Sequence, residues 1–434
     1  MVDLNRQEGQ LFSDKLLKEV NDKFYYVNQD PITKKKRVFF DNAGGAFRLK
    51  SVLESYEKVD AIPDCPERKH EVALHLQEII AKGERDSRII FNAKDGKILT
   101  MLTASRAIFE MVGAIAENIE GTNVVTTDLE HPSSYDAVAY YAQKTGKELR
   151  VAKTNPVTGG VDAEEIASLI DENTCLLNFI YASNISGAIL DVEEIVQAAR
   201  KKKPDLYITV DAVQHIPHGH VDVSKLEIDG MNFAPYKFFG NRGSGIAYIS
   251  ERLSKLPHPE LLAKEPTWQL GSPAPSQFAA ITEIVNYVCW LGNNFVISDD
   301  RRELFVEGMD RIKLQERALM NYMLKGEPDV QGLRDIEGVN VYLDYPDFTK
   351  RDFIVAMSFD HLACEDAVKE YAKRDIIVYE RLNSSIYSKR MLDSFGIEGC
   401  IRVSPLHCQS IKDMQQFLQA TLEIAKSIKE SPNV

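Results

Sequence analysis

The sequence predicts an α/β protein in which helices cover a mostly parallel sheet, with a smaller α+β domain toward the C-terminus. Two observations support this prediction. From about residue 100 to 250, short β-rich runs alternate with segments of helical periodicity. Beyond about residue 300, a long amphipathic stretch is followed by shorter strand-like and helix-like segments, which indicates a second domain.

The elements of the first part follow one another in a regular order. Strand-like runs occur at 122–127, 149–154, 175–182 and 206–212. Helix-like segments occur between them, at 133–146, 162–172 and 191–204. The last two of these segments begin with acidic residues, which suit a helix N-terminus. Strands that alternate with helices in this way are typical of parallel sheets.

The second part, beyond about residue 300, has a different order of helix-like and strand-like segments. Its long amphipathic stretch covers 299–326, and strand-like runs follow at 339–345, 353–360, 375–380 and 400–405. Helix-like segments occur at 365–374 and 410–430. We expect a large domain at 30–300 and a small domain formed by 1–29 and 301–434, with a cleft between them.

The composition of the chain limits the kinds of molecule that it is expected to bind. The chain has 434 residues and a net charge of -13, which argues against a nucleic-acid or anionic-membrane binder. A local basic pocket for a phosphate or a small anion stays compatible with this charge. The first 20 residues do not resemble a signal peptide, and no run approaches the length of a membrane span. Six scattered cysteines without a CxxC pair fit a reducing cytosol, so we expect a cytoplasmic protein.

Four polar features stand at the predicted strand ends or helix starts. Asn184 ends one apolar strand, Asp211 ends the next with Gln214 three residues later, Lys237 stands in APYKFFG, and His131 precedes a helix. In an open α/β sheet, ligands bind outside the carboxyl ends of the strands, so these side chains are expected to meet there. A lysine in apolar company is costly to keep charged, which favours a depressed pKa or contact with solvent.

This set of side chains suits one cofactor. A lysine that can form a Schiff base and an aspartate that can pair with a pyridinium nitrogen are what a pyridoxal phosphate (PLP) enzyme requires. With Asp211 beside the nitrogen, the ring accepts electrons from a carbanion at the substrate α-carbon.

The order of LTASRA, EHPSSYDA, YASNISGA, VDAVQH, APYKFFGNRGSG, LGSPAPS and IRVSP resembles the class V aminotransferase and cysteine desulfurase family. The resemblance extends from about Phe40 to the C-terminal helix. It implies the PLP-dependent transferase fold type I, with a mostly parallel seven-stranded sheet in the large domain. It also implies an enzyme that acts on a small amino-acid substrate through an external aldimine and an α-carbanion.

The resemblance also implies roles for particular residues. Lys237 would carry the cofactor, Asp211 would pair with the pyridinium nitrogen, and His131 would stack on the ring. The other expected cofactor-binding residues are Gln214 and Asn184 at the ring, and Ala104, Ser105 and Tyr236 around the phosphate. The expected substrate-binding residues are Arg402 as the carboxylate clamp, Gly44 and Asn184. Ser272 matches a position that reaches the phosphate of the neighbouring subunit, which implies a homodimer.

Each of these residues also has a purely structural interpretation. Asp211 and His131 could be helix caps, and Gln214 and Asn184 could satisfy buried backbone groups. Arg402 could pair with a surface carboxylate, and the serines could be turn or cap residues. We expect no metal site in QHIPHGH, because Pro217 and Gly219 indicate a loop.

The reaction itself stays open at this point. Cysteine desulfurases carry a nucleophilic cysteine in the loop that here covers 378–392, and this loop contains none. We expect a desulfurase-like carbon-sulfur or carbon-selenium lyase that lacks this cysteine. The alternatives are a class V aminotransferase, an epimerase that resembles isopenicillin N epimerase, and a PLP-fold binding protein without catalysis.

Overall fold

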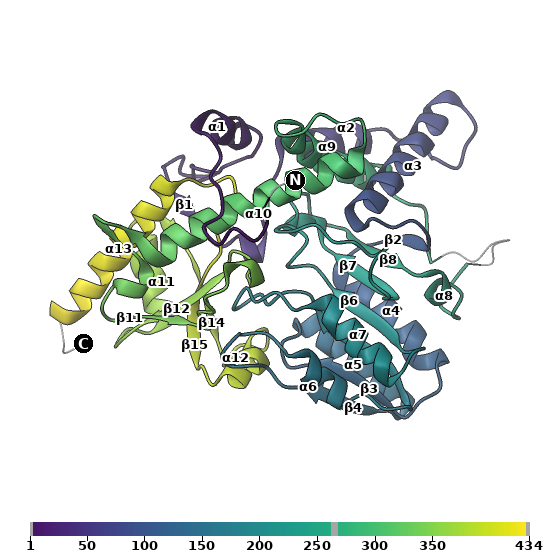
Figure 1. Ribbon diagram of the computed structural model, residues 1–434. Coiled ribbons are helices and arrows are strands. Elements are labelled where there is room, and N and C mark those ends of the chain that lie inside the picture. The colour runs from purple at the N-terminus through teal and green to yellow at the C-terminus, as the bar shows by residue number, and fades with distance from the viewer. Residues whose placement is uncertain (1–2, 262–267, 431–434) are drawn as a thin grey trace.

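The computed structural model describes residues 3–261 and 268–430, and a seven-stranded sheet forms the centre of its larger part (Figure 1). The strands of this sheet are β2 (Lys97–Met101), β3 (Asn123–Thr127), β4 (Glu148–Ala152), β5 (Thr174–Ile180), β6 (Tyr207–Asp211), β7 (Gly230–Phe233) and β8 (Gly245–Ile249). Their order across the sheet is β2-β8-β7-β6-β5-β3-β4. Only β8 is antiparallel to its neighbours in this sheet. The predicted mostly parallel sheet of seven strands is therefore confirmed.

Helices cover both faces of this sheet. The helices in the first three hundred residues are α1 (Asp14–Asp22), α2 (Lys50–Asp60), α3 (Glu71–Phe91), α4 (Ala104–Asn118), α5 (Pro132–Thr145), α6 (Ala163–Ser168), α7 (Val192–Lys202), α8 (Glu251–Ser254) and α9 (Pro275–Asn293). Successive residues of a strand point to opposite faces, and Leu176 belongs to one buried cluster with α4 and α5 while Leu177 belongs to another with α6 and α7. This alternation places the two helix pairs on opposite faces.

A four-stranded antiparallel sheet forms the C-terminal part, in the order β11-β12-β15-β14. The elements of this part are α10 (Arg301–Lys325), β9 (Gly326–Glu327), β10 (Val330–Gln331), β11 (Val339–Tyr342), β12 (Val355–Phe359), α11 (Cys364–Ala372), β13 (Ile376–Ile377), β14 (Tyr379–Leu382), α12 (Lys389–Phe395), β15 (Gly399–Val403) and α13 (Ile411–Glu430). The prediction of a single strand at 375–380 is wrong. This segment divides at Val378, because β13 pairs with β1 (Val38–Phe39) while β14 pairs with β15.

The two parts share the long helix α10. Its early residues Phe305 and Met309 belong to the core around the large sheet, and its later residues Leu319 and Met323 belong to the core around the small one. The helix α1 packs on the first core, through Leu16 among others. The proposed domain limits at residues 30 and 300 stay a prediction.

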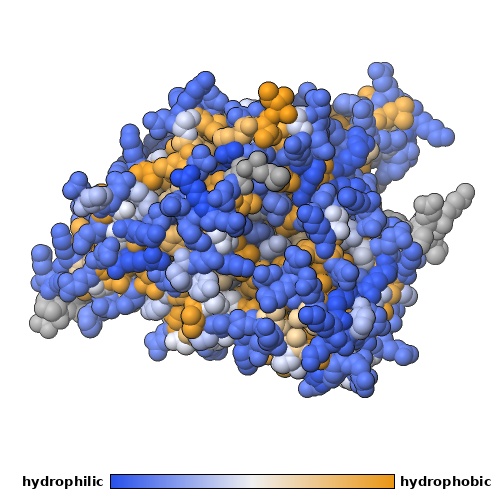
Figure 2. Space-filling model, in the orientation of Figure 1, coloured by the Kyte–Doolittle hydropathy of each residue, from blue (hydrophilic) through white to orange (hydrophobic). Residues whose placement is uncertain are grey.

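On the face shown in Figure 2, hydrophilic side chains predominate and apolar side chains form small, separated groups. Within 3–261 and 268–430, no helix combines the length and apolar character needed to cross a membrane.

Gly245 allows β8 to touch the start of α4. A Cβ atom at this position would lie 2.1 Å from the backbone nitrogen of Ala104, which is too close for any side chain. We predict that Gly245→Ala lowers the free energy of unfolding by about 1–3 kcal/mol, because the backbone of α4 must move. Thermal unfolding measures this loss. The control Gly160→Ala meets its nearest atom at 3.6 Å and should change stability little; equal effects of both substitutions would contradict the packing argument.

Candidate active site

A cavity of about 310 Å³ opens at the carboxyl ends of β5, β6 and β7. Ile180 and Asp211, the last residues of β5 and β6, line it together with Ala234, which follows β7. The parallel register of these strands brings their ends to one edge of the sheet. Strand ends at the same edge are the usual ligand site of an open α/β sheet, and the cavity occupies this place.

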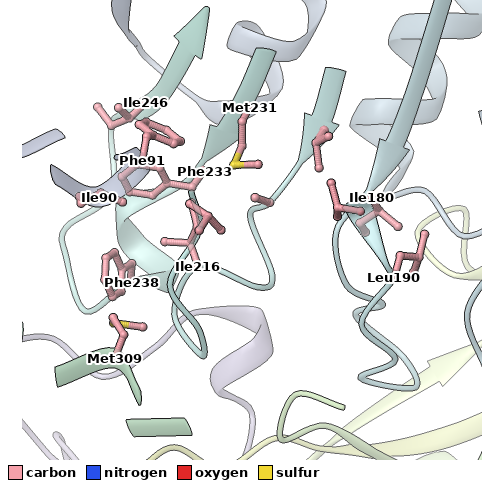
Figure 3. Packing of buried hydrophobic residues seen from close by; sticks show 14 of the residues in the cluster. Ile90, Phe91, Ile180, Leu190, Ile216, Met231, Phe233, Phe238, Ile246 and Met309 are labelled. Atoms are coloured by element: carbon pink, nitrogen blue, oxygen red, sulfur yellow. The ribbon is translucent and has the colours of Figure 1, made fainter. Parts of the chain in front are cut away.

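Lys237 enters the cavity from a short 3-10 turn, Pro235–Lys237, that follows β7. Phe233 and Phe238, which flank this turn, are fully buried. Figure 3 shows Phe238 beside Met309 of α10, below the cluster formed by Phe91 and Phe233. The aromatic anchors on both sides fix the turn, so the lysine side chain leaves it in a defined direction.

The Lys237 amine is 8% exposed, and its Nζ donates to Oε1 of Gln214 at 3.3 Å. Burial, and then the positive charge of Arg402, lower its pKa to about 8. The carboxylate of Asp211 acts in the opposite direction. The uncharged form that a nucleophilic amine requires is therefore much more populated at neutral pH than in an exposed lysine, although the charged form still predominates.

Asp211 is the buried carboxyl of the cavity. It is 3% exposed, and its Oδ1 accepts from the backbone N–H of Val213 at 3.1 Å. Burial raises its pKa to about 6, although the Val213 hydrogen bond and the charge of Lys237 favour ionisation. The carboxyl is thus mostly ionised at neutral pH and can accept a hydrogen bond from a cationic group.

His131 both caps α5 and lines the cavity. Its Nδ1 accepts from the backbone N–H of Ser133 at 3.2 Å and lies 2.8 Å from the hydroxyl oxygen of that residue. Burial, and then the charge of Lys237, lower its pKa to about 3. The ring is consequently neutral at physiological pH and can present a flat, uncharged face to a ligand.

The start of α4 forms the opposite wall. Ala104 and Ser105 line the cavity, and Thr103 caps the helix by accepting from the backbone N–H of Arg106 at 3.0 Å. The hydroxyl of Ser244, next to this wall, is buried without a hydrogen-bond partner in the described chain. Free N–H groups at a helix N-terminus attract an anion, so this wall suits a phosphate.

Arg402 does not line the cavity, but it contacts Asn184, which does. Its Nη2 donates to Oδ1 of Asp41 at 2.8 Å, and its Nη1 donates to the backbone carbonyl of Asn184 at 3.4 Å. Asn184 itself lines the cavity, four residues beyond the end of β5 and not at the strand end as the sequence suggested. Gly44 packs against Asp41 and does not line the cavity.

The remaining predicted residues divide between two places. Tyr236 lines the cavity, and the guanidinium of Arg242 lies 4.4 Å from the centre of its ring. Ser272 is exposed in a neighbouring hollow of about 430 Å³, where its hydroxyl donates to Glu67. The chain's own cavity therefore does not include Ser272.

The histidines of QHIPHGH point to three different carboxylates. His215 Nδ1 lies 2.9 Å from Asp352, His218 Nδ1 lies 2.7 Å from Glu316, and His220 Nδ1 lies 2.9 Å from Asp310. These contacts join the loop to the segment just before β12 and to α10. The motif thus has a structural explanation.

A model of the aminotransferase class-V family matches residues 38–417. The chain belongs to the class V aminotransferase family. Members of this family are PLP-dependent enzymes, so the predicted family, fold class and enzyme class are confirmed.

Curated relatives of this class V enzyme include a probable cysteine desulfurase of Borreliella burgdorferi, 26% identical over 382 residues. That match covers 84% of this chain and 79% of the relative. A cysteine desulfurase of Salmonella gallinarum is 27% identical over 276 residues, covering 59% of this chain and 63% of the relative, less than two thirds of its length. The family model matches most of the chain, whereas the Salmonella gallinarum enzyme aligns with only part of it.

Solved structures share the fold of this class V enzyme. The apo cysteine desulfurase from Thermococcus onnurineus superposes with a TM-score of 0.78 at 21% identity, covering 90% of this chain and 95% of that one. A NifS-like protein gives a TM-score of 0.75 at 22% identity, covering 90% and 100% of the two chains. At this level of identity the likeness supports the fold alone.

Sequence reasoning missed one buried acid of the site, Glu130. Its carboxyl accepts from the backbone N–H of Ile180 and from the hydroxyls of Thr127 and Ser134, each at 2.8 Å. Burial, opposed by these hydrogen bonds and aided by the charge of Asp211, raises its pKa to about 8. The sequence could have indicated Glu130 only through its position directly before His131. As a neutral acid, Glu130 links the start of α5 to β5 through these hydrogen bonds.

The lowered pKa of Lys237 can be measured without any cofactor. We predict that competitive acetylation of the apo protein, followed by peptide mass spectrometry, shows half-maximal reactivity of Lys237 near pH 8, because burial favours the neutral amine. Reactivity should rise as pH increases through this value. Lys369 is the internal control, since its hydrogen bond to Asp366 raises its pKa. A Lys237 that titrates together with Lys369 would contradict the assigned environment.

Proposed function

We propose that the cavity binds PLP and that Lys237 is the residue that holds it as a Schiff base. The side chains present fit this group: an amine of lowered pKa, a buried carboxyl and a neutral aromatic ring face one space. Three buried oxygens that line the cavity have no hydrogen-bond partner in the described chain. They belong to Asn184, Asn232 and Ser244. Unpartnered polar groups around a cavity indicate a polar ligand.

Asp211, His131 and the α4 wall would hold the ring and the phosphate. The Asp211 carboxylate would accept the N–H of the pyridine nitrogen and keep it protonated, while the His131 ring would cover the ring face. The N–H groups at Ala104 and Ser105 would bind the phosphate. PLP supplies an electron sink for the pair of electrons left at the substrate α-carbon.

Lys237 then acts on the substrate proton. Its Nζ takes the proton from the substrate α-carbon, which requires the uncharged amine that its lowered pKa provides. Gln214 accepts a hydrogen bond from this Nζ and orients it. Because His131 stays neutral, it adds no positive charge that would repel the lysine once it has taken the proton.

Arg402 is proposed to bind the substrate carboxylate, in keeping with its planar, bidentate geometry. Its Nε is buried without a partner in the described chain, while Asp41 occupies Nη2. A substrate carboxylate would therefore compete with Asp41 for this guanidinium. Because of this competition, a ligand binds well only if it also makes contacts elsewhere in the cavity.

For the reaction, we propose a carbon-sulfur or carbon-selenium lyase that uses no protein thiol. The single observation that carries this proposal is that no cysteine lines the cavity in the described chain, and that the loop 378–392 contains none. Cys400, the cysteine beside Arg402 on β15, is fully buried, and burial raises its pKa to about 12. The relatives named cysteine desulfurases favour a sulfur-containing substrate.

In this reaction the Cα–H and Cβ–S bonds of cysteine break. The proton goes to Nζ of Lys237, the sulfur leaves as hydrogen sulfide, and hydrolysis of the remaining fragment yields pyruvate and ammonia. No oxidant or reductant is needed. We also propose a cytoplasmic homodimer in which Ser272 reaches the phosphate of the neighbouring subunit; its exposed position outside this chain's own cavity is compatible with that role.

The products decide between the reactions. Incubation of the cofactor-loaded enzyme with L-cysteine or L-selenocysteine should give pyruvate with matching sulfide or selenide, and L-cystine should give pyruvate with matching cysteine persulfide. Little alanine should form in each case. Cys400→Ser should give the same products, since its thiol takes no part, and Lys237→Ala should give none.

Three results would contradict the lyase. Alanine as the main product indicates a desulfurase, and conversion of the cofactor to its amine form with release of a keto acid indicates an aminotransferase. Deuterium exchange at the α-carbon with inversion and no cleavage indicates an epimerase.

A further inference from the structure

Two arginines, Arg242 and Arg48, lie next to each other beside the cavity. Arg242 lines the cavity, and its guanidinium stacks on the ring of Tyr236. Arg48 donates through Nη1 to the backbone carbonyl of Tyr236 at 2.7 Å. An added Cβ at Gly45 would lie 3.1 Å from Nη2 of Arg242 and 3.6 Å from Nη2 of Arg48, so both guanidinium groups border the same residue.

No carboxylate of the described chain balances this pair. Neither arginine forms an ion pair, and the guanidinium of Arg242 forms no hydrogen bond, within residues 3–261 and 268–430. Burial, and then the charge of Arg242, lower the pKa of Arg48 to about 10. Neighbouring like charges are unfavourable in a partly buried place, and an anion between them would relieve this repulsion.

The pair borders the same short segment as the proposed carboxylate clamp. Gly44 packs against the carboxylate of Asp41, which binds Arg402, while the next residue, Gly45, packs against Arg48 and Arg242. Two neighbouring glycines thus lie between the Asp41–Arg402 pair and the two arginines along the segment. A ligand with two anionic groups could contact both.

We propose that Arg48 and Arg242 bind a second anionic group on the substrate side chain. The substrate class is then an α-amino acid whose side chain carries a carboxylate or another anion, with its α-carboxylate at Arg402. This assignment rests on the proposed function of the cavity. It is compatible with sulfur chemistry, because the bond that breaks and the anion can belong to different parts of one side chain.

The cofactor phosphate is the competing occupant. The free N–H groups of α4 and the Ser244 hydroxyl already form a suitable wall for a phosphate. Arg48 and Arg242 instead border Gly45, next to the segment that holds Asp41 against Arg402. The contacts with this segment favour the substrate over the phosphate.

The test compares amino acids that differ only in the side-chain charge. Aspartate, glutamate and 2-aminoadipate are each paired with the corresponding side-chain amide and titrated into the cofactor-loaded enzyme, with the dissociation constant read from the change in the cofactor absorption band. We expect the native enzyme to bind at least one acid about tenfold more tightly than its amide, as charge-assisted hydrogen bonds do. Arg242→Gln should abolish this preference and change the affinity for the amides less than about twofold. Arg242→Lys should keep part of it.

Arg85→Gln is the matched control, because Arg85 is an exposed arginine of α3 that does not line the cavity. It should leave the preference intact. A native enzyme without any preference, or an Arg242→Gln variant that keeps it, would overturn the assignment.

Parallel titration of the apo proteins with PLP and with pyridoxal tests whether the two arginines bind the cofactor phosphate. If Arg242→Gln weakens PLP binding about tenfold, leaves pyridoxal binding unchanged and keeps the acid preference, the arginines serve the phosphate and the proposal fails. A native enzyme that acquires no cofactor band contradicts the proposed function itself, and the second-anion assignment fails with it.

Discussion

The site depends on one constraint: a lysine amine is held inside the protein at the edge where the parallel strands end. Lys237 can occupy this place because Phe233 and Phe238 anchor its turn on both sides, and because Gln214 accepts a hydrogen bond from its Nζ. Its charge is costly there, and the nearby Arg402 raises the cost. The lowered pKa that results is the property on which its proposed chemistry rests.

The other groups of the site follow from the same sheet edge. Asp211 ends β6, and Glu130 accepts from the backbone N–H of Ile180 at the end of the neighbouring strand. Burial raises the pKa of Glu130 to about 8 and that of Asp211 to about 6, so near neutral pH Asp211 is the more fully ionised of the two acids. Lys237, Arg48 and Arg242 outnumber this carboxylate, so the site carries an excess of positive charge within a chain of net charge -13. Such a local excess favours anionic ligands.

Much of this arrangement could be predicted from sequence because its signals are local. The run that contains Asp211 is β-branched and apolar, and β6 forms there, while the acidic residues that begin the segment at 191 precede α7. The edge position of Lys237 followed from the rule that strand ends meet. The motif order added the roles of the individual side chains.

The parts that were missed depend on distant contacts. Nothing local indicates that 375–380 divides, since the division results from pairing of β13 with β1, more than three hundred residues away. Likewise Asp41 meets Arg402 only through the fold, and so do Arg48 and Arg242. Pairings between residues far apart in sequence leave no period or motif from which to predict them.

Covalent trapping tests the central claim most directly. The enzyme loaded with PLP is reduced with borohydride, which fixes a Schiff base, and is then digested and examined by peptide mass spectrometry. The account predicts one modified lysine, Lys237, together with loss of the absorption band near ~420 nm. Modification of a different lysine, or a Lys237→Ala variant that keeps the band at full intensity, would contradict it.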